Sequence, residues 1–317
     1  MRRISSGKRI ELTARDIELF KLLYRYQYLR SNFLYAFLGG ESETRFKERL
    51  GDLYHDGRYI RRPEQQWQFA YSRCMPIVYE LDARGEQVLR DHGLLLHESR
   101  LLSKGRMGAC RQFAHQLMIC DSLASVELGI RHQPELRFIS WQDILAKAPA
   151  TTASSDNPFA IPVTISHTFP GGTRRAEIKA VPDALFGLEY TCGAEKLYRF
   201  FALEADRNTV PVKRTNLRQT SFLRKVLAYR QIVADNIHAT YLGLPNLFVL
   251  TVTTNEKHMT NIMSLVKGFA VEGRSTLFLF KTMSSLGNYQ RAPDPTPHIL
   301  TGPWQRVGYE GLAINVA

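Results

Sequence analysis

The sequence has few cysteines and no long apolar run, and both absences narrow the class of protein. The four cysteines among 317 residues are Cys74, Cys110, Cys120 and Cys192. Because none forms a C-x-x-C pair, a zinc knuckle is disfavoured and free thiols in a reducing cytoplasm are the simplest interpretation. No apolar stretch reaches membrane-spanning length, and the basic N-terminus lacks the apolar core of a signal peptide. We therefore expect a cytoplasmic location and no membrane association.

Acidic residues are also in deficit. The chain has 42 Lys and Arg against 30 Asp and Glu, which gives a formal charge of +12 and a pI near 9.6. This excess favours a polyanionic partner, with nucleic acid the commonest, although a charge that serves only solubility is the alternative. At 44% hydrophobic residues the chain can bury proper cores, and its length accommodates two domains.

Helix signals dominate the first part of the chain. Thr13 followed by Asp16 forms a capping-box variant ahead of a strongly apolar helix. Further helices are predicted over 31–38 and 42–55, and strands over 59–63 and 67–81 enclose the turn residues 64–66. Three helices followed by a hairpin is the order of a winged helix-turn-helix, which we expect to occupy residues 1–106 with its linker.

Basic residues gather on the third helix and the predicted wing. The helix would enter the major groove of double-stranded DNA, and the wing would meet phosphates. A three-helix domain used for protein contacts or dimerisation is the alternative. The DNA-binding candidates here are Arg45, Lys47, Arg49, Arg58, Arg61, Arg62 and Arg73.

Strands and helices alternate in the remainder, residues 107–317. A long amphipathic helix is predicted over 111–131, and further helices over 215–236 and 256–271. Strands are predicted at 136–141, 161–168, 176–181, 184–190, 197–204, 247–253 and 276–281. The fold class is therefore α+β, with an α/β domain built on a mixed sheet after the N-terminal helices.

Three acidic residues stand at predicted strand ends. Glu204 and Asp206 share one face of their strand, and Asp183 precedes a strand expected to pair with it. Three carboxylates at neighbouring strand ends offer the oxygen ligands of a hard divalent cation, which can activate water for phosphodiester cleavage. The alternative is a turn residue at Asp183 and a surface ion pair after Glu204.

The pattern Pro182-Asp183, a strand, then Glu204 resembles the PD-(D/E)XK nuclease superfamily, whose core order α-β-β-β-α-β matches residues 111–253. Most of the chain also resembles the replication-relaxation family of plasmids and mobile elements, most characteristically over 201–213 and 222–229. The resemblance implies a winged helix joined to a restriction-endonuclease-like domain. It also implies Mg²⁺ or Mn²⁺ bound by Asp183, Glu204 and, as an extra ligand, Asp206.

Asp206 stands where that superfamily has its lysine. Lys225 on the following helix is the first substitute for orienting the attacking water, and Lys213 is the second. Arg218 and Arg224 would hold the DNA backbone, the ring of Tyr229 is expected in the core, and Glu127 on the long helix is a further metal-facing candidate.

The leading hypothesis is a metal-dependent endonuclease or nickase that acts in mobilisation, within a relaxosome, or in replication of a mobile element. Double-stranded DNA is the expected partner, and a relaxase or replication protein and a second copy of the chain are further candidates. The alternative is a non-catalytic DNA-binding accessory protein or transcriptional regulator with a degenerate nuclease domain.

Overall fold

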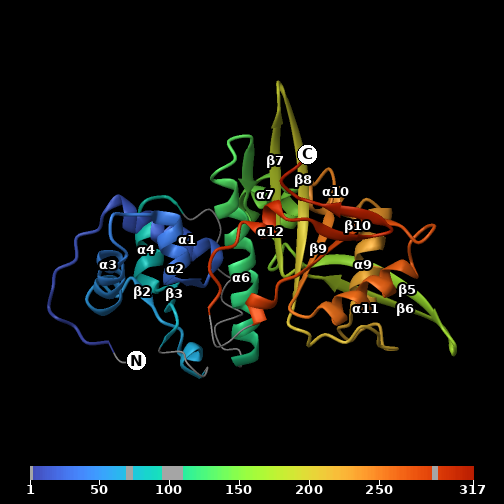
Figure 1. The fold of residues 1–317 in the computed structure, drawn as a ribbon, viewed down its shortest axis with the longest axis horizontal. Helices are drawn as coiled ribbons and strands as arrows, with labels where there is room; N and C mark the ends of the chain where they lie inside the picture. Colours follow the sequence, from blue (N-terminus) through green and yellow to red (C-terminus); the bar gives the residue numbers. More distant parts are fainter. Residues whose placement is uncertain (1–2, 69–73, 95–109, 288–291) are drawn as a thin grey trace. The chain divides into compact units, whose positions relative to one another are not determined.

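The computed structural model describes residues 3–68, 74–94, 110–287 and 292–317, and it divides into two compact units (Figure 1). The first unit comprises Met1–Leu128 with Asn288–Thr296, and the second comprises Gly129–Gly287 with Pro297–Ala317. The second domain was predicted to begin at residue 107, whereas this division keeps most of the long helix with the first unit.

The first unit opens with three helices and a small sheet. Its elements are α1 (Ala14–Tyr26), β1 (Leu29–Arg30), α2 (Ser31–Leu38), α3 (Glu43–His55), β2 (Ile60–Arg61), the 3-10 helix Glu64–Gln68, β3 (Val78–Leu81), α4 (Ala83–Asp91) and most of α6 (Cys110–Ile130). The strand order is β1-β3-β2, and both pairings are antiparallel. The three predicted helices are confirmed within one or two residues at each end.

Local sequence explains where two of these helices begin. The Thr13 side chain accepts a hydrogen bond from the Asp16 amide at 3.3 Å, and the Asp16 carboxylate accepts one from the Thr13 amide at 2.7 Å. This reciprocal capping box was predicted and satisfies amides that the first turn leaves unpaired. At α3 the Ser42 side chain accepts from the Arg45 amide, without a reciprocal bond.

The predicted hairpin is present but shorter than expected. Ile60 pairs with Leu81, yet the second strand begins at Val78 and not at Trp67. The reason lies in the buried Gln66 side chain, which donates to the Val78 carbonyl at 3.1 Å and accepts from the Val78 amide at 3.0 Å. The side-chain amide thus takes the place of a paired strand residue.

The long helix α6 packs within the first unit. Phe113, Leu117 and Cys120 form an apolar cluster with Tyr28 and Val78. Because these contacts bury α6 against Tyr28 and strand β3, the compact unit extends to Leu128 and beyond the expected boundary.

The second unit is built on one large mixed sheet. Its strands are β4 (Leu136–Ile139), β5 (Ile161–Phe169), β6 (Gly172–Ala180), β7 (Ala184–Cys192), β8 (Glu195–Asp206), β9 (Phe248–Thr253), β10 (Ser275–Thr282), β11 (Trp304–Val307) and β12 (Tyr309–Leu312). The seven-stranded order is β12-β11-β10-β9-β8-β7-β4, with β8, β9 and β10 parallel and the other neighbours antiparallel. The predicted α+β class with a mixed sheet is confirmed.

Two strand predictions need correction. The strands at 161–168 and 176–181 were placed in the same series as the others, but β5 and β6 form a separate two-stranded ribbon. The side chains of Ile161, Val163 and Ile165 belong to the apolar core that includes α9 (Phe222–Ala234). The ribbon therefore packs against this helix, and its β5 backbone pairs with β6 and not with the large sheet. The C-terminal strands β11 and β12 were missed because each has only four residues.

The predicted helix 215–236 is also too long at its start. Helix α9 begins at Phe222 after Ser221, whose side chain caps it. The amides of Phe222 and Leu223 donate to the carbonyls of Pro211 and Val212, so the preceding loop folds back on the helix. The short helices α7 (Trp141–Lys147), α8 (Ala150–Ala153), α10 (Ile237–Leu242) and α12 (His298–Thr301) were not predicted.

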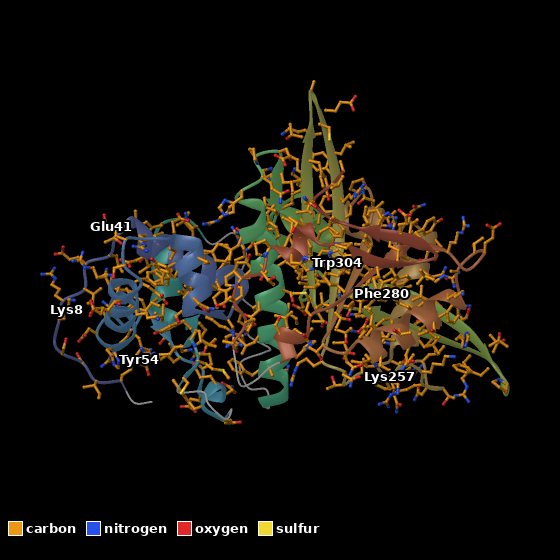
Figure 2. The ribbon with its side chains drawn as sticks, viewed as in Figure 1. Lys8, Glu41, Tyr54, Lys257, Phe280 and Trp304 are labelled. Carbon is orange, nitrogen blue, oxygen red and sulfur yellow. The ribbon has the colours of Figure 1, made fainter. Side chains whose placement is uncertain are left out.

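Helices α9 and α11 (Glu256–Lys267) pack with the sheet in one apolar core that includes Phe278 and Phe280. Figure 2 labels Phe280 and Trp304, both fully buried. Trp304 Nε1 donates to the Ile299 carbonyl at 2.9 Å, which ties the C-terminal segment to the unit. Across the described ranges, no helix has the length and apolar character needed to cross a membrane.

Candidate active site

The paired strands β7 and β8 bring two of the predicted acids together. The strand after Asp183 pairs with the strand that carries Glu204, as predicted, and the register sets Ala184 opposite Leu203, so Asp183 lies beside the end of β8. Its carboxylate accepts a hydrogen bond from the Ala205 amide at 2.9 Å. Glu204 comes directly before Ala205, and its side chain takes the opposite direction from that of Ala205 because side chains alternate along a strand.

Helix α9 supplies the counter-charge to Glu204. The Lys225 ammonium donates to Glu204 Oε2, and the Tyr229 hydroxyl donates to Glu204 Oε1 at 2.5 Å. The two donors share one side of α9 because they are four residues apart. Lys225 Nζ also lies 4.0 Å from Asp183 Oδ2, so one ammonium faces both acids. The predicted substitute lysine therefore reaches the predicted carboxylates.

Burial shifts the protonation of this cluster. It raises the pKa of Glu204 to about 7, even though the charge of Lys225 favours the carboxylate. Burial alone would lower the pKa of Lys225, but Glu204 and Asp183 raise it above its ordinary value. Burial and the Glu204 charge together raise the pKa of Tyr229. Lys225 therefore stays cationic, and Glu204 is the group that titrates near neutral pH.

Within the cluster Glu204 is buried, whereas Asp183 and Lys225 are partly exposed to solvent. The Glu204 side chain is 3% exposed, whereas those of Lys225 and Asp183 are 20% and 19% exposed. A ligand that approaches from solvent therefore meets Asp183 and Lys225 first.

Asp206 makes a different set of contacts. Asp206 Oδ2 lies 2.6 Å from His258 Nε2 on α11, and Oδ1 accepts from the amides of Thr209 and Val210 at 3.1 and 3.2 Å. These contacts fix the start of the loop after β8. Sequence reasoning missed His258, because only the packing of α11 beside the sheet brings it to Asp206.

No group of three or more His, Cys, Asp or Glu side chains in the described part of the chain could hold a metal ion. The chemistry of Asp183 and Glu204 nevertheless suits Mg²⁺ or Mn²⁺, because Mg²⁺ is commonly held by one or two carboxylates with water and substrate phosphate as the other ligands. Asp183 is partly exposed to solvent, where such ligands can join it. The three predicted acids do not form one metal-binding group in the described residues, and Lys225 contacts Asp183 and Glu204.

Two other candidates lie apart from this cluster. Lys213, the second substitute lysine, is exposed in the loop before α9. The Glu127 carboxylate in the first unit accepts from Arg25 at 2.6 Å and from the Tyr26 hydroxyl, so it was wrongly offered as a metal-facing residue.

The basic residues predicted to bind DNA divide into two groups in the first unit. Arg45, Lys47 and Arg58 are exposed, with Lys47 in an ion pair with Glu43 of its own helix. Arg49, Arg61 and Arg62 hold intramolecular partners: Arg49 binds Asp16 at 2.6 Å, Arg61 binds Glu80 at 3.0 Å, and Arg62 stacks over Tyr54 at 4.1 Å. Arg73 lies outside the described residues.

Basic side chains also surround the start of α9. Arg224 donates to the Lys179 carbonyl at 3.1 Å, and Arg174 of β6 donates to the Thr215 carbonyl at 3.0 Å. The first contact joins the ribbon to α9, and the second joins it to the loop before α9, where Arg218 is exposed. Positive charge is thus available on the elements next to Asp183 and Lys225.

No curated protein and no solved structure matches the chain significantly. The family model described as replication-relaxation matches residues 20–246, which is well over half of the 317 residues. The chain therefore belongs to the replication-relaxation family.

Proposed function

We propose that this protein binds duplex DNA through its first unit and hydrolyses a phosphodiester bond at the Asp183–Glu204–Lys225 cluster of its second unit. Membership of the replication-relaxation family indicates a role in replication or mobilisation of mobile elements. The observation that carries the proposal is the shared contact of one lysine with both acids, since Lys225 replaces the lysine missing at position 206.

The first unit is proposed to be a winged helix-turn-helix. Its order of three helices followed by the paired strands β2 and β3 supports this assignment. In this arrangement α3 is the recognition helix, and its exposed Arg45 and Lys47 are available to base edges or phosphates. The segment between β2 and β3 is proposed to be the wing, and Arg58, two residues before β2, is exposed.

In the second unit, Asp183 and Glu204 would hold Mg²⁺ or Mn²⁺. A bound ion of this kind polarises a phosphoryl oxygen and lowers the pKa of a water molecule. Lys225 supplies a fixed positive charge next to both acids, which stabilises the charge that builds up on the phosphate during cleavage. Tyr229 and Lys225 together hold both oxygens of Glu204 in one orientation.

Arg224 and Arg218 would contact the DNA backbone near the scissile phosphate. Burial lowers the pKa of Arg224 below its ordinary value, but the guanidinium remains cationic at neutral pH. Asp206 and His258 are proposed to position the loop that carries Arg218, since Asp206 binds the first amides of that loop.

Plasmid relaxation tests the proposal. Supercoiled DNA is incubated with the full chain and Mg²⁺ or Mn²⁺, and nicked and linear products are separated on a gel. We expect wild type to convert the plasmid and Asp183→Asn and Lys225→Met to fail. Glu195→Gln is the matched control, because Glu195 is an exposed acid at the other end of β8. Intact plasmid with wild type under both metals would reject cleavage.

A second candidate function is a non-catalytic DNA-binding accessory protein. The observation that favours it is the acid at position 206, which gives the strand no lysine and leaves Lys225 in an ion pair with a buried glutamate. Retained duplex binding in EDTA, together with an intact plasmid under every metal tested, would select this function over cleavage.

A further inference from the structure

A hollow of about 410 Å³ lies in the second unit between ribbon strand β5 and the C-terminal half of α9. Its walls are Ile165, Ser166, His167, Thr168, Leu227, Arg230, Gln231, Ala234 and Phe269. None of these lining residues is acidic, and the volume falls in the range of small-ligand sites, about 300–1,000 Å³. The hollow uses neither Asp183 nor Glu204, so it is distinct from the cluster described above.

Two aromatic rings and one guanidinium line this hollow, and a further ring and guanidinium lie beyond the lining on the ribbon. The Arg230 guanidinium lies over the Phe269 ring at 5.5 Å, and the His167 and Phe269 ring centroids are 5.4 Å apart. On the ribbon, the His167 and Phe169 centroids are 4.6 Å apart, and Arg174 lies over Phe169 at 5.5 Å. The rings of His167 and Phe269 are half-buried, and Arg230 is exposed.

One amide side chain joins the rings in the lining. Gln231 is held by Asp235 through a hydrogen bond of 2.8 Å. Ser166 and Thr168 alternate with His167 along β5, so their exposed side chains take the opposite direction from the His167 ring. An amide beside aromatic rings offers a donor and an acceptor to the edge of a nucleobase.

We propose that this hollow binds one nucleotide of an unpaired DNA strand. The base would stack on one of the two rings, His167 or Phe269, which are tilted by 56° to each other, and Arg230 would contact the neighbouring phosphate. Aromatic rings bind bases of single strands because every base has a π face, whereas a duplex keeps its bases stacked on one another. No lining residue is acidic, and Arg230 contributes positive charge, which favours a phosphate at this position.

The hollow and the cluster use different faces of α9. Lys225 and Arg230 are five residues apart, which is about 7.5 Å along the helix axis and about 140° around it. Lys225 faces Glu204 of β8, whereas Arg230 is exposed, so nucleotide binding at the hollow does not depend on the cluster or on cleavage.

Fluorescence anisotropy with the full chain tests the proposal. The probe is a labelled oligodeoxythymidine in metal-free buffer, compared with a labelled duplex of the same length. We expect Phe269→Leu and Arg230→Ala each to weaken single-strand binding about 5- to 100-fold, since one stacked base contributes about 1–3 kcal/mol. Neither variant should change duplex binding by more than about twofold on this basis.

Lys257→Ala is the matched control, because it removes one exposed positive charge from α11 of the same unit (Figure 2). It should leave single-strand affinity unchanged. Arg230→Ala keeps the test valid if Phe269→Leu fails to fold, since Arg230 is exposed. Free dTMP is the third arm: binding as tight as that of the oligonucleotide would assign the hollow to a free nucleotide and overturn the strand proposal.

Unchanged single-strand affinity in both variants would also overturn the proposal that the hollow binds an unpaired strand. Equal losses of affinity for the single strand and the duplex would overturn it as well. These outcomes are separate from the fate of cleavage, because the binding assay contains no metal and leaves Asp183 and Lys225 intact.

Discussion

Lys225 Nζ donates to Glu204 Oε2 and thereby joins the first turn of α9 to the end of β8. The two residues are 21 positions apart in sequence. Along the chain α9 follows β8 and precedes β9, and these two strands pair directly in parallel. A lysine missing from the strand is thus replaced in space by one from the following helix. The contact has consequences for stability that are independent of cleavage.

Removing either partner should lower the free energy of unfolding of the second unit. Removing both should lower it by less than the sum of the two single losses. Lys225→Met leaves a glutamate that is 3% exposed without its counter-charge, and such losses are about 3–5 kcal/mol. Glu204→Gln leaves a lysine that is 20% exposed and can reach water, so its effect should be smaller. Urea unfolding at pH 8 of the single and double variants measures the coupling. Additive effects would show that the pair does not interact.

The bond from Tyr229 to Glu204 should give a pH-dependent effect. Because burial raises the Glu204 pKa from 4.5 to about 7, the unfolded chain releases this proton first, and stability falls as pH rises from about 4.5 through 7. Tyr229→Phe removes a donor to the charged form and should raise this pKa further. The expected loss is about 0.5–1.5 kcal/mol at pH 5 and about 1.5–3 kcal/mol at pH 8.

Tyr241→Phe is the control for this measurement. Its hydroxyl donates to the neutral Ala160 carbonyl at 3.4 Å, so its loss should be the same at both pH values. A Tyr229→Phe effect that does not change between pH 5 and pH 8 would contradict the assigned protonation of Glu204.

The parts of the fold that sequence predicted depend on local signals. Thr13 and Asp16 mark a helix start through bonds three residues apart, and the strand ending at Glu204 has a plain apolar pattern. The placement of Asp183 beside that strand also followed, because consecutive strands commonly pair.

What sequence did not predict depends on contacts between distant segments. His258 lies 52 positions after Asp206, and only tertiary packing brings the two side chains to 2.6 Å. The Gln66 side chain replaces a strand residue beside Val78, an arrangement without a periodic signature. The ribbon β5–β6 has the alternation of any strand, so its separation from the large sheet depends on packing against α9.

Arg45 and Arg49 should behave differently although both are basic residues one turn apart on α3. Arg45 is exposed, so Arg45→Ala should weaken duplex binding and reduce the salt slope by about 1. Arg49 binds both oxygens of Asp16, at 2.6 and 3.1 Å, and also donates to the Glu11 carbonyl. Arg49→Ala should therefore destabilise the first unit by about 1–3 kcal/mol.

Anisotropy in a salt series and thermal melting separate these two effects. Arg45→Ala should melt as wild type does, and Arg49→Ala should melt earlier. Melting of Arg49→Ala at the wild-type temperature, combined with a loss of DNA affinity, would move Arg49 from the fold to the DNA interface.

Lys281 on β10 provides a test at alkaline pH. Its side chain is buried, and its ammonium donates to the His298 and Gly302 carbonyls at 2.7 Å each. Burial lowers the pKa of Lys281 from 10.5 to about 8, so between these values the unfolded chain binds more protons than the folded chain. Stability from this group should therefore rise with pH from about 8 to 10.5, by at most about 1.4 kcal/mol per pH unit.

Lys281→Met keeps the length and apolar character of the side chain over Trp304 but removes the titrating group. The difference in unfolding free energy between wild type and Lys281→Met, measured by urea at pH 7.5, 9 and 10.5, cancels the titration of other groups. We expect this difference to shift in favour of wild type as pH rises. A constant difference would mean that hydrogen bonds to the two carbonyls offset burial, because the ammonium would then keep its ordinary pKa.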